Sequence, residues 1–293
     1  MGNSASFGGA GQKDSMKKSN KLEFAVKMTC NSCVEQIRSS LDGIQGIASV
    51  DIDLTTGSVV VDTILPSHEI LRCIQTTGKD AILRGVGGKE HKNLGAAVAM
   101  LGGESGFSAV GVHGVVRLTQ IDETSCIIDG TIDGLQPGKH GLHVHECGDI
   151  SNGCESVGEH FNPHGVNHGS PENDQMHRHA GDLGNVEAGA DGRAVFRIVD
   201  PILKVWDIIG RSIVVTDSED DFGLTANEQS KIDGNSGQRL ACGIIARSAG
   251  LFENSKKICA CDGLTLWDEK NKPLAGNSRQ SKIPQQEPTA SRL

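Results

Sequence analysis

The stretch HVHECGDISNGCESVGEHFNPHGVNHGSPENDQMHRHAGD, residues 143–182, holds most of the chain's histidines. His143 and His145 alternate with apolar residues, which predicts a strand that points both imidazoles to one face, where they can bind one ion. The rest of the stretch is rich in Gly, Asn and Pro and predicts a long loop. Three further potential ligands lie on this loop: His160, His179 and Asp182. Three imidazoles and a carboxylate suit zinc, whereas His143, His145 and a shared His160 suit copper, so we predict two neighbouring metal sites.

Four motifs make this part of the chain resemble the copper/zinc superoxide dismutase family. They are His143-Val-His-Glu-Cys-Gly-Asp149, Gly158-Glu-His-Phe-Asn-Pro163, His179-Ala-Gly-Asp-Leu-Gly-Asn185 and Arg239-Leu-Ala-Cys-Gly243. The resemblance covers about residues 93 to 250 and implies an all-β Greek-key barrel. Short apolar segments between Gly, Pro and Asp turns, with a hairpin turn at 189–192, agree with this architecture.

The resemblance also implies the zinc ligands. It adds His168, because His168 follows His160 at the family's usual interval. The loop is about two residues longer than in most of the family and also contains His164 and His177, so the choice among these three histidines stays open. The predicted zinc ligands are His160, His168, His179 and Asp182.

Further roles follow from the same resemblance. Thr216 occupies the position of the family's last copper ligand, so the copper-type site is predicted to be incomplete. Its members are His143, His145, His160 and Thr216. Asp220 matches a carboxylate that links the two metal sites through their histidines, and Arg239 matches an anion-guiding arginine, with an ordinary structural arginine as the alternative. Cys154 and Cys242 match the family's intrasubunit disulfide.

A separate pattern precedes the barrel, within residues 21–90. Alternating apolar residues predict strands, and apolar residues at helical spacing predict helices. The predicted strands are Leu22–Met28, Val50–Leu54, Ser58–Asp62 and Ala81–Leu83, and the predicted helices begin near Cys33 and at Pro66. The order βαββαβ is that of a ferredoxin-like α+β domain.

The first loop of this domain contains Met28-Thr-Cys30-Asn-Ser-Cys33, with Cys33 at the start of the first predicted helix, where the pKa of a thiol is lowered. Two thiolates favour Cu(I) and leave it open to ligand exchange, while a thioredoxin-like redox pair and half of a zinc site are alternatives. The motif in its βαββαβ setting resembles the heavy-metal-associated domain of copper chaperones and copper ATPases. Lys79 matches a basic residue of some soluble copper chaperones and would offset the charge of a bis-thiolate complex; its alternative is a solvated surface charge.

The two ends of the chain lack apolar periodicity. Residues 1–20 predict a disordered leader, in which Met1-Gly-Asn-Ser-Ala-Ser6 matches a short myristoylation pattern without establishing that Gly2 is acylated. Residues 251–293 contain Cys259-Ala-Cys261 and a Ser-, Gln- and Pro-rich end, which predict a flexible tail. Cysteines one residue apart can share Cu(I) or exchange a disulfide with another protein.

Composition limits the functional classes. The chain has 293 residues, 38 glycines, nine cysteines, no tyrosine and a net charge of -9, which argues against a nucleic-acid partner. Its longest apolar run, Leu94–Leu101, is too short for a transmembrane segment, and the expected compartment is the cytosol. Three further cysteines are expected to be buried apolar residues: Cys73, Cys126 and Cys147.

The chain thus combines three parts: a heavy-metal-associated domain (21–90), a dismutase-like barrel (91–250) and a CxC tail (251–293). This arrangement resembles the family of copper chaperones for superoxide dismutase. This resemblance implies Cu(I) and zinc as metals, an upstream copper donor, and a heterodimer with copper/zinc superoxide dismutase. Since a surface near Ile209-Gly210 and Gly243–Ala246 would imitate the target's own subunit, a homodimer is expected when the chain is alone. The resemblance also allows the mitochondrial intermembrane space and the nucleus as locations.

Two other classes remain open from the sequence. An active superoxide dismutase with a metal-binding leader would need His164 or His177 to replace the ligand that is lost at Thr216. A thiol oxidoreductase that uses Cys259 and Cys261 would leave the first cysteine pair without a role.

Overall fold

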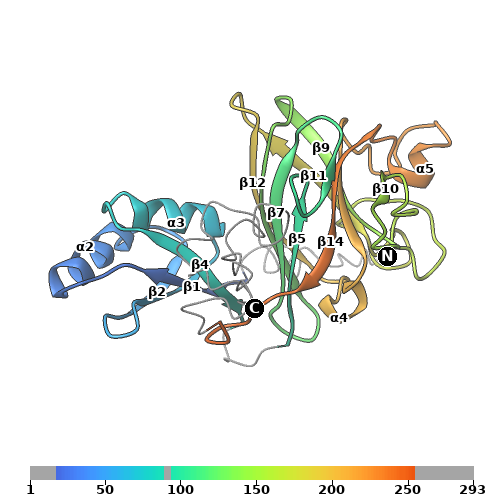
Figure 1. Cartoon of the computed structure of the whole chain (residues 1–293). Helices are drawn as coiled ribbons and strands as arrows, with labels where there is room; N and C mark the ends of the chain where they lie inside the picture. Colours follow the sequence, from blue (N-terminus) through green and yellow to red (C-terminus); the bar gives the residue numbers. More distant parts are fainter. Residues whose placement is uncertain (1–17, 89–93, 255–293) are drawn as a thin grey trace, which may run out of the picture. The chain divides into compact units, whose positions relative to one another are not determined.

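The computed structural model describes residues 18–88 and 94–254 (Figure 1). The proposed myristoylation pattern at Gly2, most of the predicted leader, and the pair Cys259/Cys261 lie outside the described residues.

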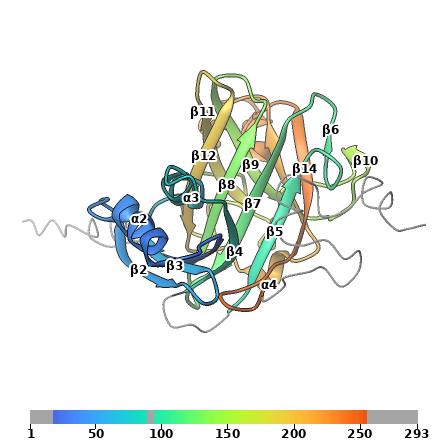
Figure 2. The same ribbon diagram turned by 60° about the vertical axis from the view of Figure 1, so that its left-hand side comes forward.

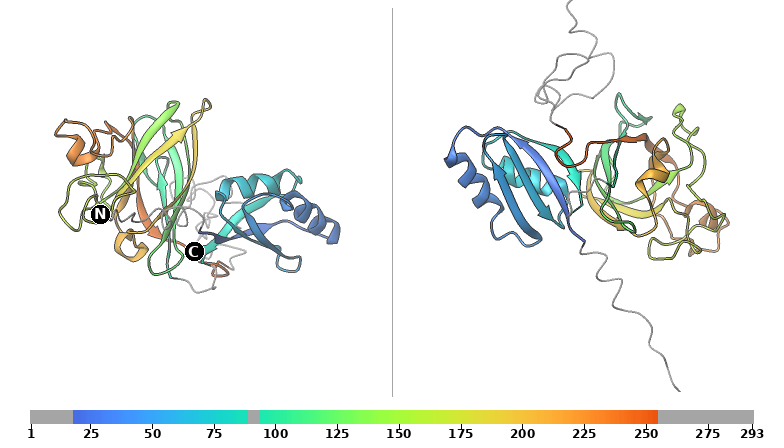
Figure 3. Two further views of the ribbon diagram at one scale, coloured as in Figure 1. Left: turned by 180° about the vertical axis from the view of Figure 1, so that it is seen from behind. Right: turned by 90° about the horizontal axis from the view of Figure 1, so that it is seen from below.

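The first domain has the predicted βαββαβ order. Its elements are β1 (Asn20–Val26), α2 (Asn31–Leu41), β2 (Ile47–Asp53), β3 (Ser58–Thr63), α3 (Ser67–Gln75) and β4 (Ala81–Gly87). The four strands form an antiparallel sheet in the order β2-β3-β1-β4, and both helices lie on one face of it (Figure 3). The ferredoxin-like prediction is therefore confirmed.

Helical spacing places the apolar side chains of both helices against this sheet. Ile37 and Leu41 of α2, with Ile70 and Ile74 of α3, are almost completely buried and pack in one cluster with Phe24 of β1. Residues three or four apart share a helix face, so these side chains cover the sheet while the polar positions between them reach solvent. This packing holds the loop between β1 and α2, which carries the cysteine pair, at one end of the domain.

The second domain is a closed barrel. Its strands are β5 (Ala96–Leu101), β6 (Phe107–Ser108), β7 (His113–Gln120), β8 (Cys126–Asp133), β9 (Gly138–His145), β10 (Ser151–Cys154), β11 (Asp182–Ala188), β12 (Arg193–Asp200), β13 (Ser212–Thr216) and β14 (Arg239–Arg247). The sheet runs β13-β9-β11-β12-β8-β7-β5-β14, with β6 added along β14, and the pairing of β13 with β14 closes it (Figure 2). An all-β barrel of the dismutase type was predicted, and this topology confirms it.

The alternation along β9 decides which face of the barrel carries the metal ligands. Leu142 and Val144 have no exposed surface and belong to the barrel's apolar core. Because successive side chains of a strand point to opposite faces, His143 and His145 point away from that core. The long connection between β10 and β11 then covers these two imidazoles, which are also buried.

Two short helices lie in the connections after β12 and β13: α4 (Val205–Ile208) and α5 (Ser230–Asp233). No helix in the described part of the chain is both long and apolar enough to cross a bilayer. The expectation that three cysteines are buried is only partly right, because Cys126 is buried, Cys73 is half-buried and Cys147 is exposed. Cys147 lies just beyond the end of β9, where the chain leaves the sheet.

Candidate functional site

Three imidazoles converge on the carboxylate of Asp182. Asp182 Oδ1 lies 2.9 Å from Nδ1 of His160, 3.0 Å from Nδ1 of His168 and 3.2 Å from Nδ1 of His179. Ligands of a tetrahedral zinc ion at about 2.0–2.1 Å are roughly 3.3 Å from one another, close to these separations. All four side chains are buried, so the donor set fits a closed tetrahedral ion.

Two of these imidazoles, His168 and His179, also form hydrogen bonds through Nε2, the ring nitrogen that points away from Asp182. These bonds fix the tautomer that each ring needs to bind a metal through Nδ1. His168 Nε2 donates to Asp220 Oδ1 at 2.8 Å, and His179 Nε2 donates to the carbonyl of Val166 at 3.0 Å. Nδ1 of both rings is buried without a hydrogen-bond partner, and each faces Asp182. An imidazole whose Nε2 carries the proton presents the lone pair of Nδ1, so these rings are oriented as metal ligands.

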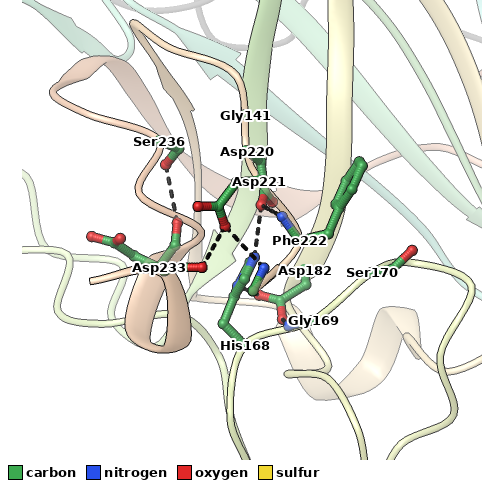
Figure 4. A network of polar contacts seen from close by, with 12 residues as sticks. Gly141, His168, Gly169, Ser170, Asp182, Asp220, Asp221, Phe222, Asp233 and Ser236 are labelled. Carbon is green, nitrogen blue, oxygen red and sulfur yellow. Dashed lines mark hydrogen bonds and ion pairs between the residues drawn. The ribbon is translucent and has the colours of Figure 1, made fainter. Parts of the chain in front are cut away.

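Asp220 joins this cluster to one histidine of β9, His143. Figure 4 shows Asp220 in one network of polar contacts with His168 and Asp182. Its carboxylate accepts hydrogen bonds from His168 Nε2 and from His143 Nε2, the latter at 2.9 Å. Burial alone would raise the pKa of Asp220, but the hydrogen bonds from these two histidines outweigh it and lower the pKa to about 2. The carboxylate is therefore charged at neutral pH and fixes one histidine of each predicted metal set.

The copper-type histidines lie close together, and His143 also belongs to a buried group with His160, His168 and Asp182 whose ligand atoms lie within 4.8 Å of one another. Nδ1 of His143 and Nε2 of His145 are buried without hydrogen-bond partners, since His143 Nε2 donates to Asp220 and His145 Nδ1 donates to the carbonyl of Gly158. The ring of His160 stacks on His143 with centroids 4.0 Å apart and lies 5.0 Å from His145. Burial, followed by neighbouring His160, lowers the pKa of His145, so its ring is neutral at pH 7.

Thr216 contributes no imidazole to this set. It is buried at the end of β13, and its hydroxyl donates to the carbonyl of Gly141 at 3.2 Å. A Cβ placed on Gly141 would lie 2.6 Å from Thr216 Oγ1 and 2.7 Å from His143 Cε1, which shows how closely Thr216 approaches the histidines. The described residues thus bring three of the four copper-type positions together as imidazoles and the fourth as a hydroxyl.

His164 and His177 do not reach either set. Both are exposed, and His177 Nδ1 pairs with Asp174 on the same loop at 2.8 Å. Among the three histidines that the sequence left open, His168 is therefore the one beside Asp182. Residues 172–177 of this loop are exposed and lie apart from the buried ligands.

The remaining residues singled out in the barrel lie close to the copper-type set. Cys154 and Cys242 are joined by a disulfide, as the resemblance implied. Arg239 donates from Nη1 to the carbonyl of Cys154 at 2.8 Å, and its charge contributes to the lowered pKa of His145. Arg239 is only half-buried, so the structural role given by this hydrogen bond does not prevent it from attracting anions.

The cysteine pair of the first domain lies where β1 leads into α2. Cys30 precedes the helix and is exposed, whereas Cys33 lies in its first turn and is buried. The two sulfur atoms are 3.7 Å apart, close enough to bind one ion. A bis-thiolate with one exposed member can receive and release a soft metal ion.

Comparisons with known proteins found a match for each of the two domains. The family model "Heavy-metal-associated domain" matches residues 23–80, and the family model "Copper/zinc superoxide dismutase (SODC)" matches residues 112–245. The human protein "Copper chaperone for superoxide dismutase" is 55% identical over 259 residues, which cover 88% of this chain and 92% of the human protein. This chain belongs to the copper chaperones for superoxide dismutase.

More distant relatives that are named chaperones and one that is named a dismutase differ in how much of this chain they match. "Copper chaperone for superoxide dismutase, chloroplastic/cytosolic" from Arabidopsis thaliana is 34% identical over 85% of this chain and 70% of its own length. "Superoxide dismutase [Cu-Zn] 5" from Dictyostelium discoideum is 54% identical, but it matches only 47% of this chain. Relatives that match most of the chain are thus named chaperones, and the dismutase matches less than half.

The chaperone's thiol site contains a residue whose role the sequence did not reveal. Thr29 Oγ1 lies 3.7 Å from Cys33 Sγ. Hydrogen bonds from the backbone and then the hydroxyl of Thr29 lower the pKa of Cys33 to about 6, with smaller contributions from Cys30 and with burial opposing them. The motif was recognised by its cysteines, and the position of a threonine hydroxyl depends on a rotamer that no spacing shows.

The structure brings Lys79 to the same end of the domain as the cysteines. Lys79 lies in the connection between α3 and β4, and the next residue, Asp80, accepts a backbone hydrogen bond from Lys27 at 3.0 Å. Lys27 comes three residues before Cys30. The sheet therefore places a half-buried cation near the thiol loop, although the two connections are about 50 residues apart in sequence.

A buried arginine of the barrel was also missed. Arg178 has no exposed surface; it donates to the backbone carbonyl of Asp182 and forms an ion pair with Asp200. Asp200 also accepts backbone hydrogen bonds from Ile202 and Leu203, so it ties the metal loop to the end of β12. An arginine between two histidines in a polar loop gives no signal of burial, because Arg is rarely buried unless paired.

Proposed function

We propose that this chain carries Cu(I) and delivers it to a copper/zinc superoxide dismutase. The observation that carries the proposal is the pair Cys30/Cys33, whose sulfurs lie 3.7 Å apart at an exposed helix start in a chain that also contains a dismutase-type barrel. Family membership supports the same function, because relatives that match most of the chain are named chaperones for superoxide dismutase.

The thiol site suits a cargo metal. With a pKa of about 6, Cys33 is mainly thiolate at pH 7, and thiolates are the ligands that select Cu(I) over hard cations. Exposed Cys30 can yield to a sulfur from a donor or an acceptor by ligand exchange. Lys79 would offset the negative charge of the complex.

In this proposal the barrel recognises the target and does not perform dismutation. Zinc, held by His160, His168, His179 and Asp182, would fix the long loop between β10 and β11. The three copper-type imidazoles with Thr216 form an incomplete ligand set, so the barrel would not hold copper as a dismutase does. Arg239 and Asp220 would then act as structural residues of this site.

The other parts of the proposal rest on the sequence. Cys259 and Cys261 would pass copper to the target and promote its disulfide, and an upstream protein would supply the Cu(I). We infer a heterodimer with the dismutase, a homodimer when the chain is alone, and a cytosolic location.

The test is transfer of copper in the presence of a competitor. Chaperone loaded with Cu(I) is mixed with a zinc-loaded, copper-free dismutase and an excess of a Cu(I) chelator, and dismutase activity is measured. We expect activation by the loaded chain and none by the same amount of free Cu(I), which the chelator removes. Equal activation by both would refute directed delivery. High dismutase activity of the chain by itself would instead favour an enzyme.

A further inference from the structure

A closed loop lies between β5 and β7, and we call its residues, Gly102–Val112, the strap. Its ends are left-handed at glycine, with φ of +62° at Gly102 and +82° at Gly111. A Cβ on Gly102 would collide with the carbonyl oxygen of Val112, so the two ends of the strap touch. A loop of this length with adjoining ends is a compact surface element of the Ω type.

The strap fills a gap along β14 at the position of Cys242. One edge of β14 pairs with β13, where Cys242 is opposite Val214. On the other edge of β14, β5 pairs only with Ile245–Arg247. Opposite Ala241 and Cys242, β6 of the strap pairs with β14 in place of β5. Ser108 fixes this position, since its hydroxyl donates to the carbonyl of Leu240 at 2.8 Å and accepts the backbone N–H of Val112 at 3.0 Å.

Phe107 covers the other half of the disulfide. Its carbonyl oxygen lies 3.9 Å from Cys154 Sγ, and a Cβ on Gly153 would come within 2.6 Å of its ring, so the ring rests directly on this glycine. β6 and β10 accordingly lie side by side (Figure 2). On the inner side the two cysteines pack against Val157 and Val214.

The result is a disulfide without access for a thiol. Cys154 is 3% exposed and Cys242 is 0% exposed. Thiol–disulfide exchange requires a thiolate to reach one of the two sulfur atoms, so burial of both prevents the reaction unless the structure opens. The strap is a cover that can open locally, because β6 has only two residues and because Phe107 and Val110 are 39% and 63% exposed.

We propose that the strap is a removable cover that keeps the Cys154–Cys242 disulfide out of thiol–disulfide exchange. When it lifts, a thiolate attacks one sulfur of the disulfide, a mixed disulfide forms and the other cysteine leaves as a thiolate that takes up a proton. A second thiol of the reductant then attacks the mixed disulfide, which leaves two protein thiols and one oxidised reductant. The rate of reduction is therefore set by the population of lifted strap and by the reductant concentration.

The purpose of such a cover rests on the proposed function. A chain that promotes a disulfide in its target brings reactive thiols and a target disulfide close to its own barrel. An exposed disulfide there would exchange with the same thiols and compete with the target. The strap separates the structural disulfide from the reactive sulfur atoms.

Reduction by dithiothreitol under native conditions tests the proposal on the full chain. Aliquots are alkylated over time, and the fraction with free Cys154 and Cys242 is measured by mass spectrometry at several dithiothreitol concentrations. We expect the double variant Phe107→Ala/Ser108→Ala to be reduced at least tenfold faster than the wild type, in proportion to dithiothreitol. Val110→Ala is the matched control, because Val110 lies on the strap but is more exposed, and its rate should stay within about twofold of the wild type.

A second variant covers the case in which the double variant fails to fold. Deletion of Ser105–Val110 leaves Gly102-Gly103-Glu104-Gly111-Val112 between β5 and β7, removes β6 and should give the fastest reduction. The proposal is overturned if reduction of the folded deletion variant is as slow as in the wild type. The proposal is also overturned if the rate of disulfide reduction in the variants does not depend on the dithiothreitol concentration and increases only as much as their rate of global unfolding. Dismutase is absent from this assay, so a failure of copper delivery leaves its outcome unchanged.

Discussion

Thr216 shows how one side chain separates a catalytic ligand set from an incomplete one. The three imidazoles beside it are buried, and the free nitrogens of His143 and His145 have no hydrogen-bond partner. A hydroxyl that donates to Gly141 cannot replace the fourth imidazole. The barrel thus brings together three of the four side chains predicted for a dismutase-type copper site as imidazoles and the fourth as a hydroxyl.

The substitution Thr216→His should complete that set. We expect dismutase activity of the copper- and zinc-loaded variant to exceed that of the wild type at least tenfold, because four imidazoles can hold copper through its redox cycle. Steady-state dismutase activity and copper content are measured together. Thr216→Val is the control, since it keeps the shape of Thr216 and adds no ligand. A wild type as active as a true dismutase would contradict the proposed function.

A second residue-scale prediction concerns Thr29. Above a pH of about 6, the lowered pKa of Cys33 makes it a thiolate, and its reaction with iodoacetamide in the metal-free protein should be half-maximal near that pH. Thr29→Ala removes the hydroxyl and should raise the pKa, so that alkylation at pH 6 slows several-fold. Thr29→Ser keeps the hydroxyl and should resemble the wild type. Equal pH profiles for all three proteins would exclude the hydroxyl as a cause.

For single residues, the sequence identified candidate ligands better than it identified the residues that they contact. Alternation placed His143 and His145 on one face of a strand, and the structure places both imidazoles outside the barrel core. The choice of His168 over His164 and His177 depended on the path of the long loop between β10 and β11, which has no periodicity. Burial of Arg178 likewise depends on Asp200, a contact between segments that local patterns do not connect.

Among the elements, the long loop between β10 and β11 is the one that we expect a metal to stabilise. Asp182 holds it by accepting the backbone N–H groups of Gly169 and His179 as well as by facing three imidazoles. Binding of an ion to the folded loop alone would stabilise the barrel by linkage, by about 2.7 kcal/mol at a free zinc concentration 100-fold above Kd.

Asp182→Ala should therefore remove the zinc-dependent part of the stability. For the wild type we expect the Tm to fall by roughly 5–10 °C when zinc is chelated, since about 1 kcal/mol corresponds to about 2–4 °C at this size. In Asp182→Ala the difference between zinc-loaded and chelated protein should vanish, together with bound zinc. Asp174→Ala, on the exposed part of the same loop, should behave as the wild type. Unchanged zinc content in Asp182→Ala would reject this ligand.

The elements that the sequence failed to predict are those with no local signal. β6 is two residues long and exists because β5 leaves part of one edge of β14 unpaired. β14 was recognised as a motif around Cys242 and as a candidate subunit contact, but its nine-residue length follows from pairing with β13, β5 and β6. Periodic segments such as β1 and β3 were predicted, because their alternation reflects burial of one face.

For the molecule as a whole, we predict that two cysteine pairs divide the task of copper delivery. Cys30 and Cys33 lie on a folded domain at a helix start, an arrangement suited to affinity for Cu(I). Cys259 and Cys261 follow the barrel in sequence and are predicted to act on flexible chain, where a thiolate can reach a partner's sulfur. The first pair should thus matter for capture and the second for transfer.

Replacing each pair by serine tests this division. Cys259→Ser/Cys261→Ser should abolish activation of a copper-free dismutase even with abundant copper, while complex formation with the dismutase persists. Cys30→Ser/Cys33→Ser should fail only when copper is scarce, and added copper should restore most activation. The readouts are dismutase activity across a copper titration and the size of the complex in solution.

Cys147→Ser is the control for loss of an exposed thiol outside both pairs, and its activation curve should match that of the wild type. The division of labour predicts opposite responses to copper in the two double variants, because capture is limited by metal supply and transfer by access to the target's sulfur atoms. Rescue of the tail variant by added copper would show that the tail also serves capture. Loss of its complex with the dismutase would show that the tail, and not the barrel, recognises the target.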